Sequence, residues 1–559
     1  NDLFLGHHRL SIVDPEDTHA NQPMRRGDIT MLFNGEIYNY KELGFDTSSD
    51  SEALLLLYAR EGEKFTQKLR GMYAIAFYHH TSGSLYLYRD PFGKKPLYYA
   101  YELGSFYFAS EIKAILPLLK NQSHWPHLLN RYLSFQSSIA PATCYSAISQ
   151  LPSGSSLCFE NGEIVCKQFY DLLETKNQIS NKDKALEKIE SHLKESVNYR
   201  LVSDVKVAAL LSGGIDSSLV CAMAKKEQES LETFCIGYEG YEKYDERPYA
   251  KEVATHIGSE HTEIVLSKAD FFESLESVIS HMDMPLADPA IVPLHFMTQK
   301  IHQRGIKVLL TGDGADELFF GYTKYIEVMD VEQIEIKRFA GFLKKQMYKN
   351  FVSNKEWEWH KRLFEGTPIY RSMAEMYSDR QQNNLLIKQV EDDFSLKEIA
   401  HYRQQFEESS FSHSANWYSF IDLKVMMGEV YLSKLDRMSM LNSIEARSPF
   451  LDTKLVELAF GIDPELRFGN ADKTLLKAVA KKYIPHSVIE RRKKGFSYPF
   501  IEWMNEEGEL DRITQLNSKY KLFDPEMLDF MIGRAKLKGK FKYHLFSIYM
   551  YLRWLDKSP

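Results

Sequence analysis

Residues 206–220, KVAALLSGGIDSSLV, decide the fold that we predict for this chain. Residues 207–211 form a short apolar run with a β-branched start, which is long enough for a buried strand and too short for a helix. Ser212, Gly213 and Gly214 follow, and such small residues let backbone N–H groups approach an anion closely. A strand followed by a glycine loop favours a phosphate-binding turn.

A helix is expected next, over residues 217–226, with Asp216 or Ser217 as its cap and the positive end of its dipole facing the loop. The loop has neither the Walker pattern nor the three-glycine spacing of a dinucleotide fingerprint. The run SGGIDSS, which ends at Ser218, instead resembles the pyrophosphate loop SGGxDSS of the N-type ATP pyrophosphatases, which split ATP into AMP and pyrophosphate to activate a substrate oxygen. An ordinary glycine-rich turn is the alternative, and it would match six fixed positions only by chance.

Strands alternate with helices around this loop. The expected strands are residues 205–211, 233–237, 262–266 and 306–310, and residues 246–257 form one of the helices between them. This alternation predicts an α/β doubly wound parallel sheet, with its site at the carboxyl ends of the strands.

A second loop, TGDGADELFFGY at residues 311–322, follows the last of these strands. Asp313, Asp316 and Glu317 crowd acidic groups beside glycines there. Uncompensated carboxylates repel one another, so a divalent cation is their natural partner, and magnesium with pyrophosphate is the expected form. A solvated acidic turn is the alternative.

The residues before 170 show the pattern of an antiparallel α+β domain. The expected strands are residues 30–33, 74–78, 84–89, 97–101 and 105–109, with a hairpin over residues 156–166. Residues 50–60 are expected to form a helix, with Ser49 or Asp50 as its cap.

Five runs in this part are similar to one known family. They are GHHRLSIVD (6–14), FNGEIYNY (33–40), SSDSEALL (48–55), RDPFGKKPLYY (89–99) and FASEIKAI (108–115). They resemble the glutaminase domain of the asparagine synthetase family, glutamine amidotransferases with an N-terminal-nucleophile, αββα fold. The resemblance implies a glutaminase domain over residues 1–170 and an ATP pyrophosphatase domain with C-terminal helices over residues 171–559.

The resemblance also implies a glutamine site. Free glutamine offers a carboxylate, an ammonium and an amide, so its pocket needs a cation, an anion and an oxyanion donor. Arg9 is assigned to the carboxylate, Asp50 and Glu36 to the ammonium, and the Asn34 side chain with the Gly35 N–H to the oxyanion. The alternatives are a surface salt bridge for Arg9, a helix cap for Asp50 and a turn for Asn34-Gly35.

The ATP site is implied in the same way. Asp216 and Asp316 are assigned to the magnesium and phosphate cluster, and the adenosine to backbone and apolar contacts. The full set of implied ATP-binding residues is Leu210, Ser212, Gly213, Gly214, Asp216, Ser217, Ser218, Ile236, Thr311 and Gly312.

Two residues are expected to act in catalysis at this second site. Asp313 stands where asparagine synthetases commonly carry glutamate. Lys493, in RRKKGFSYPF (491–500), is aligned with a lysine that neutralises phosphate charge as pyrophosphate leaves, and Lys494 is the alternative register.

The run LDRMSMLNSIEARSPFLD (435–452) matches the family as well. Within it, Glu445 and Arg447 either form a structural ion pair or order the substrate loop.

The nucleophile of the glutaminase is expected to be a cysteine at the mature N-terminus, whose α-amine acts as the base. The chain opens at Asn1, close to the arginine motif, and none of its five cysteines occupies a compatible position. The join from Leu43 to Gly44 is also short for the family. We therefore expect that the sequence lacks an N-terminal segment and an internal loop.

The expected reaction has three steps: glutamine releases ammonia, Mg-ATP converts a carboxylate into an acyl-adenylate, and ammonia attacks that acyl group. Aspartate is the expected acceptor, giving asparagine. Asp313, Phe320 where glycine is frequent, and the segment LDRMSM leave other carboxylates open, including sugar acids and β-lactam precursors.

Other classes of protein fit less well. A sulfur-transferring enzyme acting on tRNA would need a basic face and catalytic cysteines, and the net charge is −8. A silent binding protein would have no need of Asp216, Asp316 and Lys493. The five scattered cysteines and the absence of a long apolar run predict a cytoplasmic protein with no membrane partner, and we also consider a homodimer.

Overall fold

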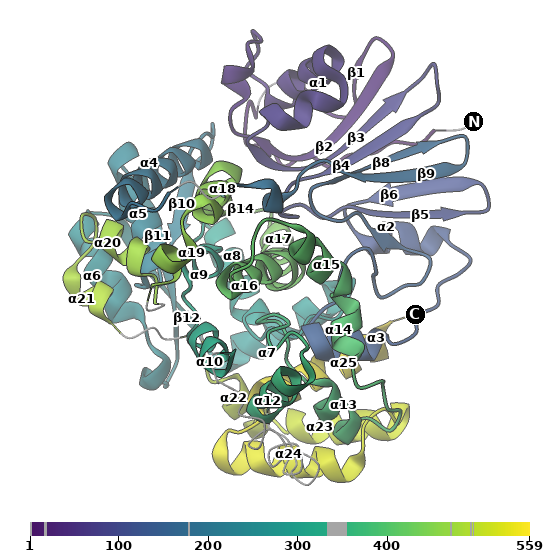
Figure 1. Ribbon diagram of the computed structural model, residues 1–559, viewed down its shortest axis with the longest axis vertical. Helices are drawn as coiled ribbons and strands as arrows, with labels where there is room; N and C mark the ends of the chain where they lie inside the picture. The colour runs from purple at the N-terminus through teal and green to yellow at the C-terminus, as the bar shows by residue number, and fades with distance from the viewer. Residues whose placement is uncertain are drawn as a thin grey trace.

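The computed structural model describes residues 3–15, 20–176, 179–332, 355–469, 472–491, 495 and 497–558 (Figure 1). Within those residues, none of the helices combines the length and the apolar character that crossing a bilayer requires.

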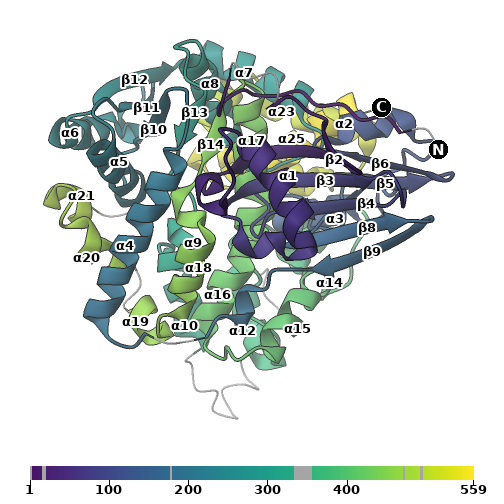
Figure 2. The ribbon, with the colours of Figure 1, turned by 90° about the horizontal axis from the view of Figure 1, so that it is seen from above.

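A five-stranded sheet with the order β12-β11-β10-β13-β14 forms the centre of the second half of the chain. Its strands are β10 (Val207–Leu210), β11 (Glu232–Tyr238), β12 (Glu260–Leu266), β13 (Val308–Leu310) and β14 (Glu445–Arg447). All four neighbouring pairs are parallel. Figure 2 shows α5 (Ile215–Glu227) and α6 (Arg247–Ile257) on one face and α7 (Lys268–His281) and α8 (Ile291–His302) on the other. The predicted doubly wound parallel sheet is confirmed.

Three details of this sheet differ from the sequence prediction. The strand β14 was not predicted, although it completes the sheet beside β13. The helix α5 begins at Ile215 and not at Ser217, and its N-cap is Gly214, which has no side chain to cap it. The prediction of Asp216 or Ser217 as the cap is therefore wrong. Because the backbone becomes helical directly after the glycines, both residues fall in the first turn, where their side chains can bind other groups.

The first part of the chain contains two antiparallel sheets. One has six strands in the order β1 (Met24–Arg26), β2 (Ile29–Ile37), β3 (Gly71–His79), β4 (Leu85–Arg89), β8 (Ser155–Glu160) and β9 (Glu163–Gln168). The other has three, in the order β6 (Ser105–Ala109), β5 (Tyr98–Glu102) and β7 (Ser149–Gln150).

Hydrophobic residues hold these layers together. Leu87 and Leu157 of the large sheet lie in one buried cluster, against which Tyr99 and Phe106 of the small sheet pack. On the opposite face, the Phe77 ring stacks on Tyr58 of α1 (Asp50–Glu61), and both lie in the main core. The helix and the two sheets form the layers expected of the glutaminase fold.

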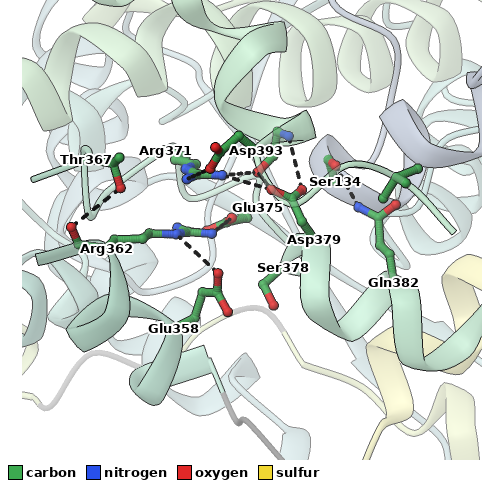
Figure 3. Close-up of polar contacts among 12 residues, drawn as sticks. Ser134, Glu358, Arg362, Thr367, Arg371, Glu375, Ser378, Asp379, Gln382 and Asp393 are labelled. Carbon is green, nitrogen blue, oxygen red and sulfur yellow. Dashed lines mark hydrogen bonds and ion pairs between the residues drawn. The ribbon is translucent and has the colours of Figure 1, made fainter. Parts of the chain in front are cut away.

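The helical region after the sheet is held by buried ion pairs (Figure 3). Arg362 of α12 (Lys355–Glu365) binds Glu375 at 2.6 Å, and Arg371 binds Asp379 at 3.0 Å. Gln382 of α13 (Asp379–Leu385) donates to Ser134 Oγ at 2.7 Å, so this network fastens the C-terminal half to α3 (Leu128–Phe135).

Candidate active sites

The phosphate loop between β10 and α5 depends on a glycine that no other residue can replace. Gly213 has φ +72°, and a Cβ there would lie 2.7 Å from backbone atoms of Tyr249 and Ala250. Ser212 Oγ and Ser217 Oγ are 3.0 Å apart, and Ser217 Oγ accepts the Ser212 N–H. These contacts close the loop on itself just after the carboxyl end of β10.

The acidic loop after β13 lies directly against the phosphate loop. A Cβ on Gly312 would come within 2.9 Å of the Ser217 nitrogen and 3.1 Å of Asp216 Cβ. Thr311, at the base of this loop, donates its N–H to the Arg447 carbonyl at 2.9 Å, and its hydroxyl lies 3.0 Å from Ser448 Oγ. The strand β14 therefore supports the acidic loop. The two loops share one site at the edge of the sheet.

Lys473 joins the two loops, and the sequence reasoning missed it. Its Nζ lies 2.5 Å from Asp216 Oδ2 and 2.6 Å from Asp316 Oδ1, and its side chain is 5% exposed. Burial by itself lowers the pKa of Lys473, but the charges of Asp216 and Asp316 outweigh burial and raise it. Lys473 precedes α20 (Thr474–Ala480) in the αL conformation, and no local sequence pattern marks it.

The position of Lys473 indicates that a cation fits between Asp216 and Asp316. An ammonium group already lies between two carboxylates from different loops, so the position favours positive charge. Carboxylate oxygens are also the ligands that Mg²⁺ prefers. The described residues contain no group of three or more His, Cys, Asp or Glu side chains placed to hold a metal by themselves.

Of the other acidic groups of this loop, Glu317 is buried and Asp313 is half-buried. Burial raises the pKa of Asp313, while a hydrogen bond with Thr311 and the charge of Lys434 act in the opposite direction. Burial and the neighbouring Asp316 raise the pKa of Glu317 to about 8. Tyr322 donates its hydroxyl to Glu317 Oε1 at 2.6 Å.

The remaining residues assigned to ATP fall near the two loops. Leu210 ends β10, Ile236 lies on the neighbouring β11, and the Ser218 side chain is buried in the first turn of α5. Lys493 and Lys494 lie outside the described residues. Just before them, Arg491 donates to the Gly213 carbonyl at 3.4 Å and forms an ion pair with Glu246.

The residues assigned to glutamine surround the end of β2 and the start of α1. Arg9 donates to the carbonyls of Val13 and Asp14 at 2.8 and 2.9 Å, and Ser48 donates to the Asp14 carboxylate at 2.6 Å. The guanidinium of Arg9 is thereby linked to the segment that leads into α1, where Asp50 lies.

Asn34 and Gly35 are part of β2, so the alternative of a turn at this position is wrong. Gly35 has φ +143°, and a Cβ there would lie 1.9 Å from the Met72 carbonyl oxygen. Only glycine at position 35 lets β2 approach β3 this closely without a change in the backbone of β2.

Asp50 is not the cap of α1, since the Ser49 side chain accepts the Glu52 N–H. The buried Asp50 carboxylate instead accepts the Ile37 N–H at 3.1 Å. Burial raises the pKa of Asp50 to about 6, despite hydrogen bonds that lower it.

Glu36 connects the two candidate sites. Its carboxylate is 3.7 Å from Arg447 Nη2, and Arg447 Nε donates to Glu445 at 2.8 Å. Burial raises the pKa of Glu36 well above its usual value, and Glu445 and Asp50 raise it further. The Glu445–Arg447 ion pair therefore forms, and Arg447 also reaches Glu36 of β2.

A pyrophosphate loop on a doubly wound sheet, joined to a layered glutaminase domain, defines a glutamine amidotransferase with an ATP pyrophosphatase domain. Comparison with known proteins supports this class. The family model described as "Asparagine synthase" matches residues 188–556, and that described as "Glutamine amidotransferase domain" matches residues 1–170. The chain belongs to the asparagine synthase family.

Individual relatives agree with this family. The chain is 35% identical over 521 residues to "Asparagine synthetase [glutamine-hydrolyzing] 1" of Bacillus subtilis (strain 168), covering 90% of this chain and 81% of the relative. It is 31% identical to "Putative asparagine synthetase [glutamine-hydrolyzing]" of Mycobacterium tuberculosis (strain ATCC 25618 / H37Rv), covering 91% and 81%. It is 26% identical to "Asparagine synthetase B [glutamine-hydrolyzing]" of Escherichia coli (strain K12), covering 90% and 77%.

Proposed function

We propose that this chain amidates aspartate to asparagine, with glutamine as the nitrogen donor and ATP as the activating substrate. The observation that carries the proposal is the contact between the phosphate loop and the acidic loop, bridged by Lys473 between Asp216 and Asp316. That arrangement gathers phosphate-binding N–H groups and cation-binding carboxylates at one position.

A carboxylate is too poor an electrophile to accept ammonia, so it is first joined to AMP. The phosphate loop binds the triphosphate, and Asp216 and Asp316 are the residues that would hold Mg²⁺. When bound, Mg²⁺ supplies charge neutralisation for the departing pyrophosphate. Lys473 and the proposed Lys493 add fixed positive charge near the same phosphates.

Ammonia comes from the glutaminase half. Arg9 would bind the glutamine carboxylate, and Glu36 with Asp50 its ammonium. Asn34 and the Gly35 N–H would stabilise the oxyanion that forms when the N-terminal cysteine of the family attacks the amide. Ammonia released there crosses to the acyl-adenylate and displaces AMP.

The test is to incubate the full-length protein with Mg-ATP, glutamine and aspartate. We expect pyrophosphate and asparagine to appear in equal amounts. Replacing glutamine by ammonium chloride should keep asparagine synthesis, because the second site acts on free ammonia. Pyrophosphate formed only with a different carboxylic acid would overturn aspartate as the acceptor.

Two further properties stay predictions. A cytoplasmic location follows from the use of cysteine, and fractionation of cells tests it. A homodimer is the second, and sedimentation equilibrium of the full-length protein measures its mass.

A further inference from the structure

An ion pair at the edge of the ATP site has no part in the mechanism described above. It joins Lys434, on α17 (Leu432–Met440), to Asp288, which lies shortly before α8. The two side chains are 13% and 15% exposed. They are therefore accessible to a small molecule, unlike the buried pairs in the interior of the protein such as Arg200–Asp452, which are 1% and 2% exposed.

The pair borders the acidic loop. Lys434 and Asp288 both act electrostatically on the carboxyl of Asp313. The ammonium of Lys434 also lies 4.6 Å from the centre of the Tyr431 ring. Tyr431, beneath that ammonium, lies on the segment just before α17, so the ion pair and the ring belong to one cluster.

This pair is the complement of an α-amino acid. Such a substrate carries an ammonium and a carboxylate on one carbon. It can therefore break a Lys–Asp pair and form two charge-assisted bonds in its place, with its ammonium on the aspartate and its carboxylate on the lysine. The Lys–Asp pair and the zwitterion are each neutral, so the exchange leaves no uncompensated charge. The side-chain carboxylate of the substrate would remain free to face Asp313 and the phosphate loop.

We propose that Asp288 and Lys434 bind the α-ammonium and the α-carboxylate of the acceptor amino acid, so that only its side-chain carboxylate reaches ATP. The inference rests on the proposed function and narrows it. A sugar acid has no ammonium for Asp288 to bind. The site therefore selects amino acids that carry a second carboxylate.

The experiment measures exchange between ATP and labelled pyrophosphate, with three acids as substrates. Aspartate has both α-groups, succinate lacks the ammonium, and β-alanine lacks the α-carboxylate. For the unmodified protein we expect kcat/KM for aspartate to exceed that for either analogue by about 100-fold, since each charge-assisted bond discriminates by about 10- to 100-fold.

The variants separate the two roles. Asp288→Asn should lower kcat/KM for aspartate about 10- to 100-fold and leave succinate within about twofold, because succinate never used Asp288. Lys434→Gln should lower kcat/KM for aspartate by a similar factor and leave kcat/KM for β-alanine within about twofold of the parent value. The KM for ATP should change less than about threefold in both.

A matched control is available in a remote ion pair of the same exposure. Arg131 and Glu398 are 2.7 Å apart and 18% and 16% exposed. Glu398→Gln breaks that pair and should leave the preference among the three acids unchanged.

The outcomes distinguish the inference from the proposed function. If aspartate supports no exchange in the unmodified protein, the proposed function fails and the inference falls with it. If aspartate supports exchange but succinate or β-alanine serves equally well, only the inference is overturned, and this result needs no variant. The inference would also be overturned if a folded variant lost kcat/KM equally for aspartate and for the analogue that lacks the matching group, which is succinate for Asp288→Asn and β-alanine for Lys434→Gln.

Discussion

At the scale of single residues, a buried carboxylate at a candidate binding site lowers the stability of the protein when it is charged. Asp50 is the clearest example. Its pKa rises from 3.8 to about 6 because burial penalises its charged form. Under the proposed function, the ammonium group of glutamine would compensate this buried charge.

Asp50→Asn should therefore stabilise the protein while removing glutamine binding. A shift of about two pKa units corresponds to about 3 kcal/mol. Because the folded state holds the proton more tightly, Asp50 lowers stability progressively as pH rises from about 4 through 6. At pH 7.5 the variant should unfold at a higher urea concentration than the parent, and at pH 4 the two should unfold at the same urea concentration. A gain that persists at pH 4 would contradict this origin.

Lys473 shows the opposite balance, since it holds two carboxylates together. Lys473→Met should lower the free energy of unfolding by about 3 kcal/mol, because Asp216 and Asp316 lose their shared partner. Added MgCl₂ should then raise the Tm of the variant more than that of the parent. Differential scanning calorimetry with and without MgCl₂ measures both effects.

Lys477→Met is the control for this variant. Lys477 lies on α20 and pairs with the exposed Asp472, and exposed pairs contribute less than about 1 kcal/mol. An identical response to MgCl₂ in the two variants would argue against a cation position between Asp216 and Asp316.

One departure from the family pattern has a local explanation. Phe320 stands where glycine is frequent, and its backbone is left-handed at φ +57°. Its ring is fully buried, and the Arg467 guanidinium lies 4.9 Å from the ring centre. Burial of the ring offsets the strain, which is about 1 kcal/mol for a left-handed residue.

At the scale of elements, the site depends on two strand-to-helix loops that touch. Gly312→Ala tests this contact, since its Cβ would lie 2.9 Å from the Ser217 nitrogen. The backbones must then move apart. We expect the KM for ATP to rise about 10-fold or more in ammonia-dependent synthesis, with a smaller effect on stability.

Gly533→Ala is the matched change in open space. A Cβ at Gly533, in α24 (Pro525–Lys538), meets no atom within 4 Å. This substitution should raise the free energy of unfolding by about 1 kcal/mol and leave the KM for ATP unchanged. If both variants bind ATP like the parent, the contact between the loops does not position the nucleotide.

At the scale of the whole molecule, buried charges join the glutaminase layers to the parallel sheet. Asp452 binds Arg70 at 2.7 Å and Arg200 at 2.8 Å, and Lys94 donates to the Leu451 carbonyl at 3.2 Å. The segment after β14 is thus held from both halves of the chain. Arg447, the last residue of β14, comes just before this segment, and it supports the acidic loop and faces Glu36.

Asp452→Asn should be strongly destabilising. Burial raises the pKa of Asp452, but Arg200 and Arg70 outweigh burial and lower it to about 2. Removing the charge takes from the buried Arg200 its carboxylate partner and leaves Arg70 with Glu195, which costs about 3–5 kcal/mol. The stabilisation is present above pH 4 and is lost as pH falls toward 2. Urea unfolding at pH 7 measures the loss.

The effect on coupling provides a second measurement for this variant. Ammonia-dependent synthesis should fall less than glutamine-dependent synthesis, because only the latter needs both halves in register. Equal losses with the two nitrogen sources would show that Asp452 serves stability alone.

The sequence by itself determined the two loops, the alternation of strands and helices and the first half of β2, because these depend on local chemistry. Small residues permit a phosphate loop, and apolar periodicity separates strands from helices. These properties are written within about fifteen consecutive residues, so they can be recognised without knowing the fold.

Only the tertiary structure decided which distant groups meet. Three features join segments more than about 130 residues apart. They are the pairing of β14 with β13, the bridge from Lys473 to Asp216 and Asp316, and the contact of Glu36 with Arg447. No local pattern marks a lysine or a three-residue strand for such a role. Their pairing is set by the packing of the sheet and helices, which brings opposite charges into a low-dielectric interior. An unpaired charge is costly there, so the charges form ion pairs.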